Sequence, residues 1–351
     1  MSRNLNYLCI LSIFVLTLVG CTSTSVSAVQ LTSTDPPAPA STPTETRPPT
    51  VTASPTTTLT STATLPPSAT PMPQPTPTAT PEPAELKYVV LISIDGLRPD
   101  ALEIADTPTL DALRAAGAYS AKAKSVLPSV TLVNHASMLG GMGPDKHGIT
   151  WNVLDPEAGK IKGPTLFSVA HEAGLSAVMV VGKPKLEHIV LPDSVDAFYQ
   201  PGYTDRQVVN QALEIIDTDQ PDILFIHLPD VDTAGHLTGW MGLGQLLAIN
   251  LTDRLIGNIV SALKDADVLK NTLLIITADH GGSGLAHGTD SPEDSTIPWL
   301  AVGPGIPAGV TIKQDIIIYD TAATILYALG LPIPETWDGR PVTEIFDQDE
   351  K

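Results

Sequence analysis

Short, almost continuous apolar runs alternate with helical patterns after residue 85, and this alternation constrains the fold more than any other feature of the chain. The apolar runs are rich in Val, Ile and Leu, as expected for strands buried on both faces of a sheet, and they cover residues 88–94, 177–181, 223–226, 273–276 and 297–302. Helical patterns cover residues 108–116, 165–173, 205–216, 243–266 and 321–329. Strands that alternate with helices predict an α/β fold, a three-layer sandwich around a central, mostly parallel sheet.

Composition divides the chain into three predicted regions. Residues 1–21 contain Arg3 and a short apolar run that ends in Leu-Val-Gly-Cys, which resembles a lipobox and predicts a lipoprotein signal peptide. The alternative is a plain secretory signal in which Cys21 has no role. Residues 22–84 consist mainly of Thr, Ser, Pro and Ala, and they predict a disordered linker. Residues 85–351 are predicted to form the folded domain.

The predicted signal implies an extracytoplasmic protein that is held at the cell envelope by lipid on Cys21, or a secreted protein if the cysteine is not acylated. Cys9 would leave with the signal, so we expect no disulfide in the mature chain. The net charge of −19 disfavours binding to nucleic-acid polymers. Small anionic substrates are not excluded, because bound metal ions can reverse the local field.

Acids and histidines follow three of the predicted strands, where functional groups gather in open α/β sheets. These side chains are Asp95, Asp232, His236, Asp279, His280 and His287. Carboxylates and imidazoles suit zinc, and this set exceeds what one tetrahedral ion can use. We therefore predict two divalent ions, most simply zinc. A pair of metal ions about 3.5–4 Å apart is a known arrangement for displacement at phosphorus.

The motifs ISIDGLRPD, VTLVNHASMLGG, GPDKHGITWN, DTAGH, ADHG and AHG occur in this order along the chain. Together they resemble the alkaline phosphatase superfamily, and within it the type I phosphodiesterase/nucleotide pyrophosphatase family. The resemblance covers residues 87–345 and includes the sequence WDGRP near the end. It implies an alkaline phosphatase-like catalytic domain that hydrolyses small phosphoesters, with nucleotides among the candidate substrates.

The resemblance also implies a role for each site residue. It assigns two sets of metal ligands: Asp95, Thr131, Asp279 and His280 in one, and Asp232, His236 and His287 in the other. It implies that Thr131 is the nucleophile and forms a phospho-threonine intermediate, and that Asn152 contacts the phosphoryl oxygens. A free Thr hydroxyl is a poor nucleophile at neutral pH, so metal binding would be needed to activate it.

Some of these residues have simpler interpretations. Thr131 could be only the N-cap of the helix that follows. Asp230 competes with Asp232 for one ligand place, and the Asp-x-x-x-His spacing of the family selects Asp232, whereas position selects Asn152 over Asn134. The other histidines are expected to be structural: His227 buried and hydrogen-bonded, His135 packed beside the site, His147 bracing a turn, and His171 and His188 on the surface.

The segment between His280 and His287 has only six residues, whereas nucleotide-specific members of the family usually carry a long insertion there. Recognition of a nucleoside base is therefore in doubt. A phosphomonoesterase or a phosphonate hydrolase of the same superfamily remains an alternative. A phosphoethanolamine-type transferase is disfavoured, because the sequence offers no transmembrane segment after residue 21. A non-catalytic surface lipoprotein is the alternative from a different class, and it would be expected to have lost ligands.

Overall fold

The computed structural model describes residues 85–346, so the predicted signal peptide and linker lie outside the described residues. Within the described part, eight strands form one sheet in the order β4-β3-β5-β1-β6-β7-β2-β8. The strands are β1 (Tyr88–Ile94), β2 (Ala118–Lys124), β3 (Ala177–Val181), β4 (Ala197–Tyr199), β5 (Ile223–Leu228), β6 (Thr272–Thr277), β7 (Thr296–Val302) and β8 (Val310–Thr311).

The sheet is mostly parallel. Strand β1 lies at its centre and pairs in parallel with β5 on one side and β6 on the other. Strands β3 and β4 continue the parallel order beyond β5. Strand β7 is the exception, because it runs antiparallel to both of its neighbours, β6 and β2. The prediction of a central, mostly parallel sheet is confirmed.

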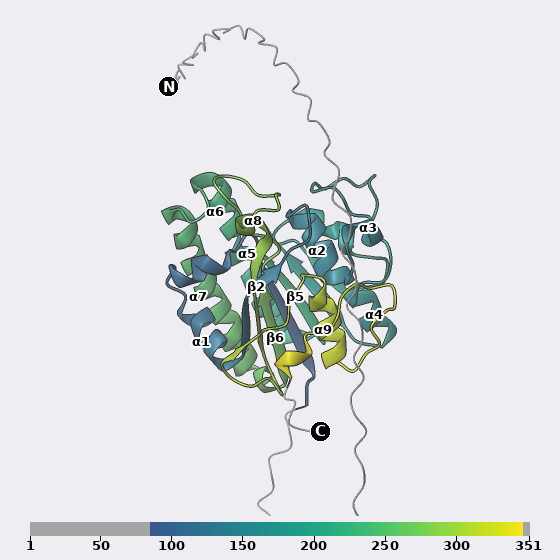
Figure 1. Ribbon diagram of the computed structural model, residues 1–351. Coiled ribbons are helices and arrows are strands. Elements are labelled where there is room, and N and C mark those ends of the chain that lie inside the picture. Colours follow the sequence, from purple (N-terminus) through teal and green to yellow (C-terminus); the bar gives the residue numbers. More distant parts are fainter. Residues whose placement is uncertain (1–84, 347–351) are drawn as a thin grey trace, which may run out of the picture. The chain divides into compact units, whose positions relative to one another are not determined.

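Helices cover both faces of the sheet (Figure 1). One layer contains α1 (Pro108–Ala116), α5 (Asp205–Thr218), α6 (Asp230–Thr238) and α7 (Leu243–Asp265). The other contains α2 (Thr131–Gly140), α4 (Leu166–Glu172) and α9 (Asp320–Ala328). Short helical segments complete the domain: α3 (Pro144–His147), α8 (Pro292–Ser295), η1 (Pro99–Glu103), η2 (Pro184–Ile189), η3 (Leu269–Asn271) and η4 (Thr343–Ile345). The predicted three-layer sandwich is therefore confirmed.

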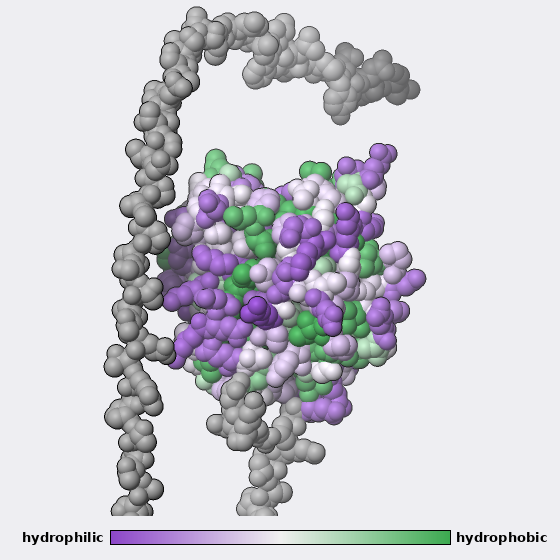
Figure 2. All heavy atoms as spheres, turned by 45° about the vertical axis from the view of Figure 1, so that its right-hand side comes forward, coloured by the Kyte–Doolittle hydropathy of each residue, from purple (hydrophilic) through white to green (hydrophobic). Residues whose placement is uncertain are grey.

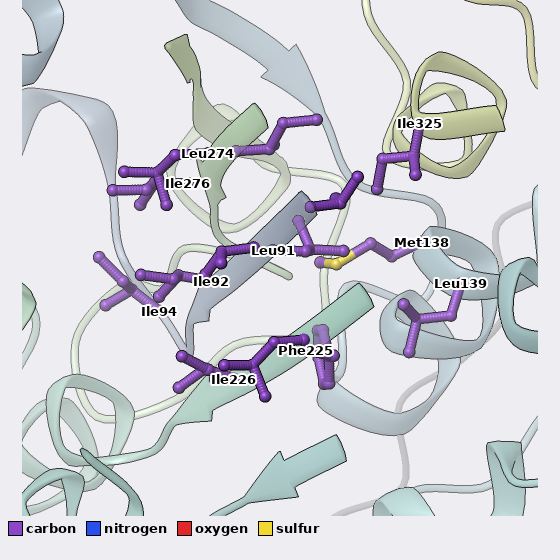
Figure 3. Close-up of a cluster of buried hydrophobic side chains, with 14 of the residues drawn as sticks. Leu91, Ile92, Ile94, Met138, Leu139, Phe225, Ile226, Leu274, Ile276 and Ile325 are labelled. Carbon is purple, nitrogen blue, oxygen red and sulfur yellow. The ribbon is translucent and has the colours of Figure 1, made fainter. Parts of the chain in front are cut away.

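The central strands are buried on both faces, which explains their almost continuous apolar sequences. Leu91 of β1 and Phe225 of β5 are register partners, and they point toward Met138 of α2 (Figure 3). The next pair, Ile92 and Ile226, points to the opposite face. All five side chains have 0% of their surface exposed. Burial on this scale is the main source of stability for the domain, since each large apolar side chain contributes about 1.5–3 kcal/mol.

The long helix α7 is long and apolar enough to pass a length and composition test for a membrane span. Its contacts with α1, α5 and α6 are those of a packing helix within the domain. It also buries Asp253, whose carboxylate accepts hydrogen bonds from the backbone N–H groups of Thr109 (3.1 Å) and Leu110 (2.8 Å) at the start of α1. The face of the domain shown in Figure 2 is largely hydrophilic, with hydrophobic side chains in smaller groups.

Candidate active site

The predicted site residues come together at the carboxyl ends of neighbouring strands. Asp95 follows β1 directly, and Asp279 and His280 lie just beyond β6. Helix α6, which begins two residues after the end of β5, carries Asp232 and His236. The central pairings of β1 with β5 and β6 bring these three segments side by side, because the strands are parallel and end at the same edge of the sheet.

Thr131 lies at the start of α2 but does not cap it. The N-cap residue is Val130, in extended conformation, and the structure has no side-chain capping hydrogen bond at this helix. The interpretation of Thr131 as the N-cap is therefore wrong. Its Oγ1 atom instead lies 3.4 Å from His280 Nε2 and 3.4 Å from Lys183 Nζ, with the residue 1% exposed. The hydroxyl thus faces the cluster of acids and histidines.

Asn152 lies against the first turn of α2 with a fixed orientation. Its Oδ1 atom accepts hydrogen bonds from the backbone N–H of Leu132 (2.9 Å) and from Lys185 Nζ (2.9 Å). With the carbonyl satisfied in this way, the amide NH₂ is left available as a donor. The competing residue, Asn134, is used internally: its amide nitrogen donates to backbone carbonyls, including that of Val130.

Asp95 and Asp232 each have one oxygen engaged by a cation. Lys183 Nζ lies 2.6 Å from Oδ2 of Asp95 and 2.6 Å from Oδ2 of Asp232. His227 Nε2 also lies 2.8 Å from Asp95 Oδ2, so the predicted buried and hydrogen-bonded His227 is confirmed and lies beside the site. The other oxygen of each carboxylate, Oδ1, is buried without a hydrogen-bond partner.

Asp279 also has one oxygen that accepts hydrogen bonds and one that has no hydrogen-bond partner. Its Oδ1 atom accepts hydrogen bonds from the backbone N–H groups of Gly96 (3.1 Å) and His280 (3.0 Å). Its Oδ2 atom is buried and has no hydrogen-bond partner. Buried polar atoms are normally paired, so three unpaired carboxylate oxygens in one cluster indicate a site for a cation.

The three site histidines share one arrangement, in which Nδ1 lies 2.8 Å from a backbone carbonyl. The pairs are His236 with Leu285, His280 with Gly281, and His287 with Ser129. Since a carbonyl can only accept, Nδ1 carries the proton in each ring and Nε2 is left with its lone pair free. This is the usual way in which a second contact prepares an imidazole to bind a metal through Nε2.

The free nitrogens face the free carboxylate oxygens in two groups. His236 Nε2 and His287 Nε2 lie 3.4 Å and 3.5 Å from Asp232 Oδ1. His280 Nε2 lies 3.4 Å from Asp95 Oδ1 and 3.3 Å from Asp279 Oδ2. The side chains therefore form two groups, and His236 is the most exposed of them, with its side chain 44% accessible.

The donor atoms fit divalent metal ions. Asp232, His236 and His287 can offer ligand atoms that all lie within 4.8 Å of one another, and so can Asp95, Asp232 and His280. The second group differs from the predicted set because it includes Asp232 and does not include Asp279. Carboxylate oxygens and neutral imidazoles without thiolates are the donors expected for zinc.

Burial and charge together set the protonation of the site. Burial, and next the neighbouring His287, lower the pKa of His280 to about 4, so the ring is neutral near pH 7. Burial tends to raise the pKa of Asp95, but the Lys183 ammonium and His227 hold it well below its usual range. Burial and the Asp95 charge raise the pKa of Asp279 well above its usual range. A cation near Asp279 would oppose this rise.

Two lysines that were not predicted from the sequence also belong to the site. Lys183 contacts two carboxylates and the Thr131 hydroxyl, and Lys185 contacts Asn152. The signal that could have identified them is their position, because both follow the end of the predicted strand 177–181. The predicted site contains the acids and histidines at the strand ends but not these lysines.

The remaining histidines divide between confirmed and wrong predictions. His147 braces a turn as predicted, because its Nδ1 accepts the Ile149 N–H (3.1 Å) and its Nε2 lies 3.0 Å from Ser137 Oγ. His135 is buried, and His171 is exposed. His188 is not a surface residue: it is 2% exposed, with Nε2 accepting the backbone N–H of Asp155 (3.0 Å). It packs edge-on against Trp151, and this contact was not visible from sequence spacing.

A buried acid of α5, Asp205, contacts the start of α6, the helix that carries Asp232 and His236. Asp205 Oδ1 accepts a hydrogen bond from the backbone N–H of Asp230 (2.9 Å), and Oδ2 accepts one from the Thr252 hydroxyl. Asp230 is the first residue of α6. Among the described hydrogen bonds and ion pairs, it makes no contact with the site carboxylates. Burial, and then the charge of Asp230, raise the pKa of Asp205 to about 7.

We expect Asp205→Asn to remove a pH dependence of stability. The unfolded carboxyl ionises near pH 4, whereas the folded one ionises only near pH 7, so stability falls as the pH rises between these values and then stays level. The amide oxygen can accept from the Asp230 N–H while the amide NH₂ donates to the Thr252 hydroxyl oxygen, so the variant should be more stable than the parent by up to about 4 kcal/mol at pH 8 and little different at pH 4. Denaturant unfolding at both pH values, with chelator present, measures this difference. A difference that does not change with pH would contradict the prediction.

Comparison with known proteins places these observations in a family. Residues 89–294, more than half of the chain, match the family described as type I phosphodiesterase/nucleotide pyrophosphatase. An uncharacterized pyrophosphatase/phosphodiesterase of Schizosaccharomyces pombe is 27% identical over 215 residues, which are 55% of this chain and 44% of that protein. A venom phosphodiesterase of Macrovipera lebetinus is 25% identical over 219 residues, 55% of this chain and 25% of that protein. The chain thus spans less than half the length of these curated relatives.

Solved structures agree on the fold. Murine ectonucleotide pyrophosphatase/phosphodiesterase 5, in an inactive form in complex with AMP, is similar with a TM-score of 0.65 at 18% identity, over 75% of this chain and 100% of that chain. A phosphonate monoester hydrolase from Silicibacter pomeroyi is similar with a TM-score of 0.57 at 18% identity, over 76% and 78% of the two chains. The family match over residues 89–294 establishes that the chain belongs to the type I phosphodiesterase/nucleotide pyrophosphatase family.

Proposed function

We propose that this chain is a metal-dependent phosphodiesterase/nucleotide pyrophosphatase that hydrolyses phosphoesters through a phospho-threonine intermediate on Thr131. The observation that carries the proposal is the position of the Thr131 hydroxyl. It lies at the start of α2, 3.4 Å from His280 Nε2, beside a cluster of buried carboxylates with unpaired oxygens. Family membership supports the same chemistry.

The proposed metal ligands are the residues with free donor atoms. They are Asp95, Asp279, His280 and Thr131 for one ion, and Asp232, His236 and His287 for the other. When bound, two divalent ions supply Lewis-acid activation of the attacking hydroxyl and stabilise charge on the leaving oxygen. The neutral state of His280 and the Nδ1 contacts of all three imidazoles support this assignment.

The protein groups around Thr131 support attack on a phosphoryl group. Thr131 Oγ1 loses its proton and forms the new bond to phosphorus, while the bond to the leaving oxygen breaks and that oxygen takes up a proton. Water then attacks phosphorus, the bond from phosphorus to Oγ1 breaks, and Oγ1 takes up a proton from that water. The N-terminus of α2 favours negative charge at this position. The NH₂ of Asn152 can donate to the phosphoryl oxygens, because its carbonyl is already held by Leu132 and Lys185.

We also propose the cellular setting predicted from the sequence. The signal peptide of residues 1–21, lipid on Cys21 and the linker of residues 22–84 would hold the catalytic domain, residues 85–351, outside the cytoplasm. Relatives named ectonucleotide and venom enzymes support an extracytoplasmic site of action. Incorporation of labelled palmitate into the intact chain, with its loss in Cys21→Ala, is the measurement that tests the lipid.

A phosphomonoesterase or phosphonate hydrolase is the second candidate. Two observations favour it: the short segment between His280 and His287, and the additional positive charge of Lys183 and Lys185, which suits a phosphoryl group with two negative charges. The rival without catalysis, a surface lipoprotein that has lost its ligands, has no support, because all the predicted ligands are present.

An ester panel separates these candidates. We expect the kcat/KM for bis-p-nitrophenyl phosphate to exceed that for p-nitrophenyl phosphate by at least about tenfold, a difference of about 1.4 kcal/mol in transition-state stabilisation. A nucleotide p-nitrophenyl ester in the same panel tests for recognition of a base. A strong preference for the monoester would reject the diesterase assignment and favour the second candidate.

A further inference from the structure

Lys183 connects the two halves of the proposed metal centre. Its Nζ atom lies 2.6 Å from Asp95 Oδ2 and 2.6 Å from Asp232 Oδ2, and each of these acids belongs to a different proposed ligand set. In both acids Lys183 contacts Oδ2, which in Asp95 also lies 2.8 Å from His227 Nε2, and not the oxygen that faces a proposed metal-binding imidazole. The oxygen that does face one, Oδ1, is left unpaired in each case.

This division of oxygens matters because a carboxylate can turn about its last bond and present either oxygen. A cation fixed on Oδ2 of Asp95 holds Oδ1 toward His280, 3.4 Å away. The same cation on Oδ2 of Asp232 holds Oδ1 toward His236, 3.4 Å away. Contacts of this kind, one step outside the ligand atoms, orient metal ligands and commonly change metal affinity by 10–100-fold when they are removed.

The backbone around Lys183 is fixed on both sides, which makes it suitable for this role. Gly182 packs closely on Pro229, the residue after β5: a Cβ atom at position 182 would lie 2.4 Å from Pro229 Cγ. The Gly182 N–H donates to the His227 carbonyl in β5 (3.2 Å). Pro184 opens the short helix η2 directly after the lysine. The lysine is therefore anchored at the end of β3, and only 19% of its side chain is exposed.

The charges provide an independent reason for a cation at this place. Asp95, Asp232 and Asp279 are buried together, with 0%, 3% and 0% of their surface exposed. Removing one partner of a buried ion pair is strongly destabilising, because it leaves a charge that is neither solvated nor paired. Among the described Lys and Arg residues, Lys183 is the cation that forms ion pairs with two of these acids, Asp95 and Asp232.

We propose that Lys183 is a positioning residue, the resident counter-cation of the metal-free centre. It clamps one acid from each half, sets the spacing between the two ligand sets and keeps their Oδ1 atoms turned toward the metal positions. The inference rests on the proposed metal-dependent function. It adds to that function a residue that acts through the ligands.

The test compares Lys183→Met with Lys185→Met in the full chain. Lys185 is a matched control, because it lies two residues away and contacts Asn152 but forms no ion pair with a carboxylate in the described part of the chain. After chelation, we expect Lys183→Met to melt about 10 °C below the parent, and Lys185→Met to stay within about 2 °C. Zinc should then raise the melting temperature of Lys183→Met by less than that of the parent, because ligand oxygens that are no longer held toward the metal positions bind zinc more weakly.

A second variant keeps the inference testable if Lys183→Met does not fold. Lys183→Arg retains the charge, so its metal-free melting temperature should stay close to that of the parent. Its longer, planar head group cannot reproduce the two short contacts, so zinc affinity, measured by competition with a chromogenic chelator, should fall about tenfold.

Three outcomes decide between the proposals. Equal metal-free melting temperatures and equal zinc shifts for Lys183→Met and Lys185→Met would overturn the role of Lys183. Unchanged zinc affinity in Lys183→Arg would overturn its role in orienting the ligands. Failure of the parent chain itself to bind zinc would contradict the metal-dependent function, and the comparison of metal-free variants would still report on the counter-cation.

Discussion

Replacing Thr131 with Ala should reduce phosphoester turnover by at least about 10³-fold while the protein keeps its zinc and its fold. Loss of a nucleophile that acts together with its activating groups typically costs at least this much. The fold should survive because the hydroxyl makes only long contacts of 3.4 Å with His280 and Lys183 and does not cap α2. Zinc should stay because Asp95, Asp279 and His280 remain in that ligand set.

Thr131→Ser is the matched control, since it keeps a hydroxyl at the same position. Steady-state rates, zinc content and thermal unfolding should be measured on all three proteins. Acid quenching during turnover of a diester, followed by peptide mass spectrometry, should find on residue 131 of the parent a phosphoryl group that still carries the second alcohol of the substrate, and none in the Ala variant. Loss of zinc and fold together in Thr131→Ala would show that the residue is structural, and turnover above about one hundredth of the parent rate would exclude it as the nucleophile.

Removal of divalent ions should abolish turnover, to below about one thousandth of the initial rate, and added zinc should restore it. The physical reason is the set of oxygen atoms without a hydrogen-bond partner: three buried carboxylate oxygens lie 3.3–3.5 Å from the Nε2 atoms of three imidazoles. Among the described hydrogen bonds, the Thr131 hydroxyl contacts His280 and Lys183, both at 3.4 Å. His280 is a proposed metal ligand and Lys183 is a cation, so neither is positioned as a general base.

Metal analysis should accompany the activity assay. We expect two ions per chain in the active protein, and recovery of activity in proportion to the zinc that is bound. A control with magnesium alone should restore little, because magnesium prefers oxygen ligands in octahedral geometry. Full turnover in protein shown to be free of transition metals would refute the proposed mechanism, and a saturating content of one ion per chain would refute the second ligand set.

The sequence predicted the central part of the fold because burial on both faces leaves a direct trace in the residues. Strands β1 and β3 were predicted with their observed limits, 88–94 and 177–181. Strand β2 was missed, because AYSAKAK has no apolar run and only part of it is buried. The antiparallel direction of β7 was also beyond prediction, because it depends on how the chain returns to the sheet edge and the apolar run 296–302 is the same in either direction.

The acidic and histidine part of the site could be predicted because these types follow strand ends in recognisable motifs, and the structure brings all of them together with Thr131 and Asn152. Their catalytic and ligand roles stay predictions. Lys183 was missed for a physical reason: Lys is almost always a surface residue, and only the folded arrangement shows that two acids far apart in the sequence surround it. His188 was misjudged in the same way, because its burial depends on Trp151 from a distant loop.

The central position of β1 has a consequence for how the protein acquires its metal. The proposed ligands run from Asp95 to His287 along the chain, and they meet only when β1 is paired with both β5 and β6. No short stretch of the nascent polypeptide holds a complete set, so high-affinity loading must follow folding, when the entropy of closing these long loops has already been lost. The zinc content of a preparation should therefore report the fraction of molecules that have reached their native topology.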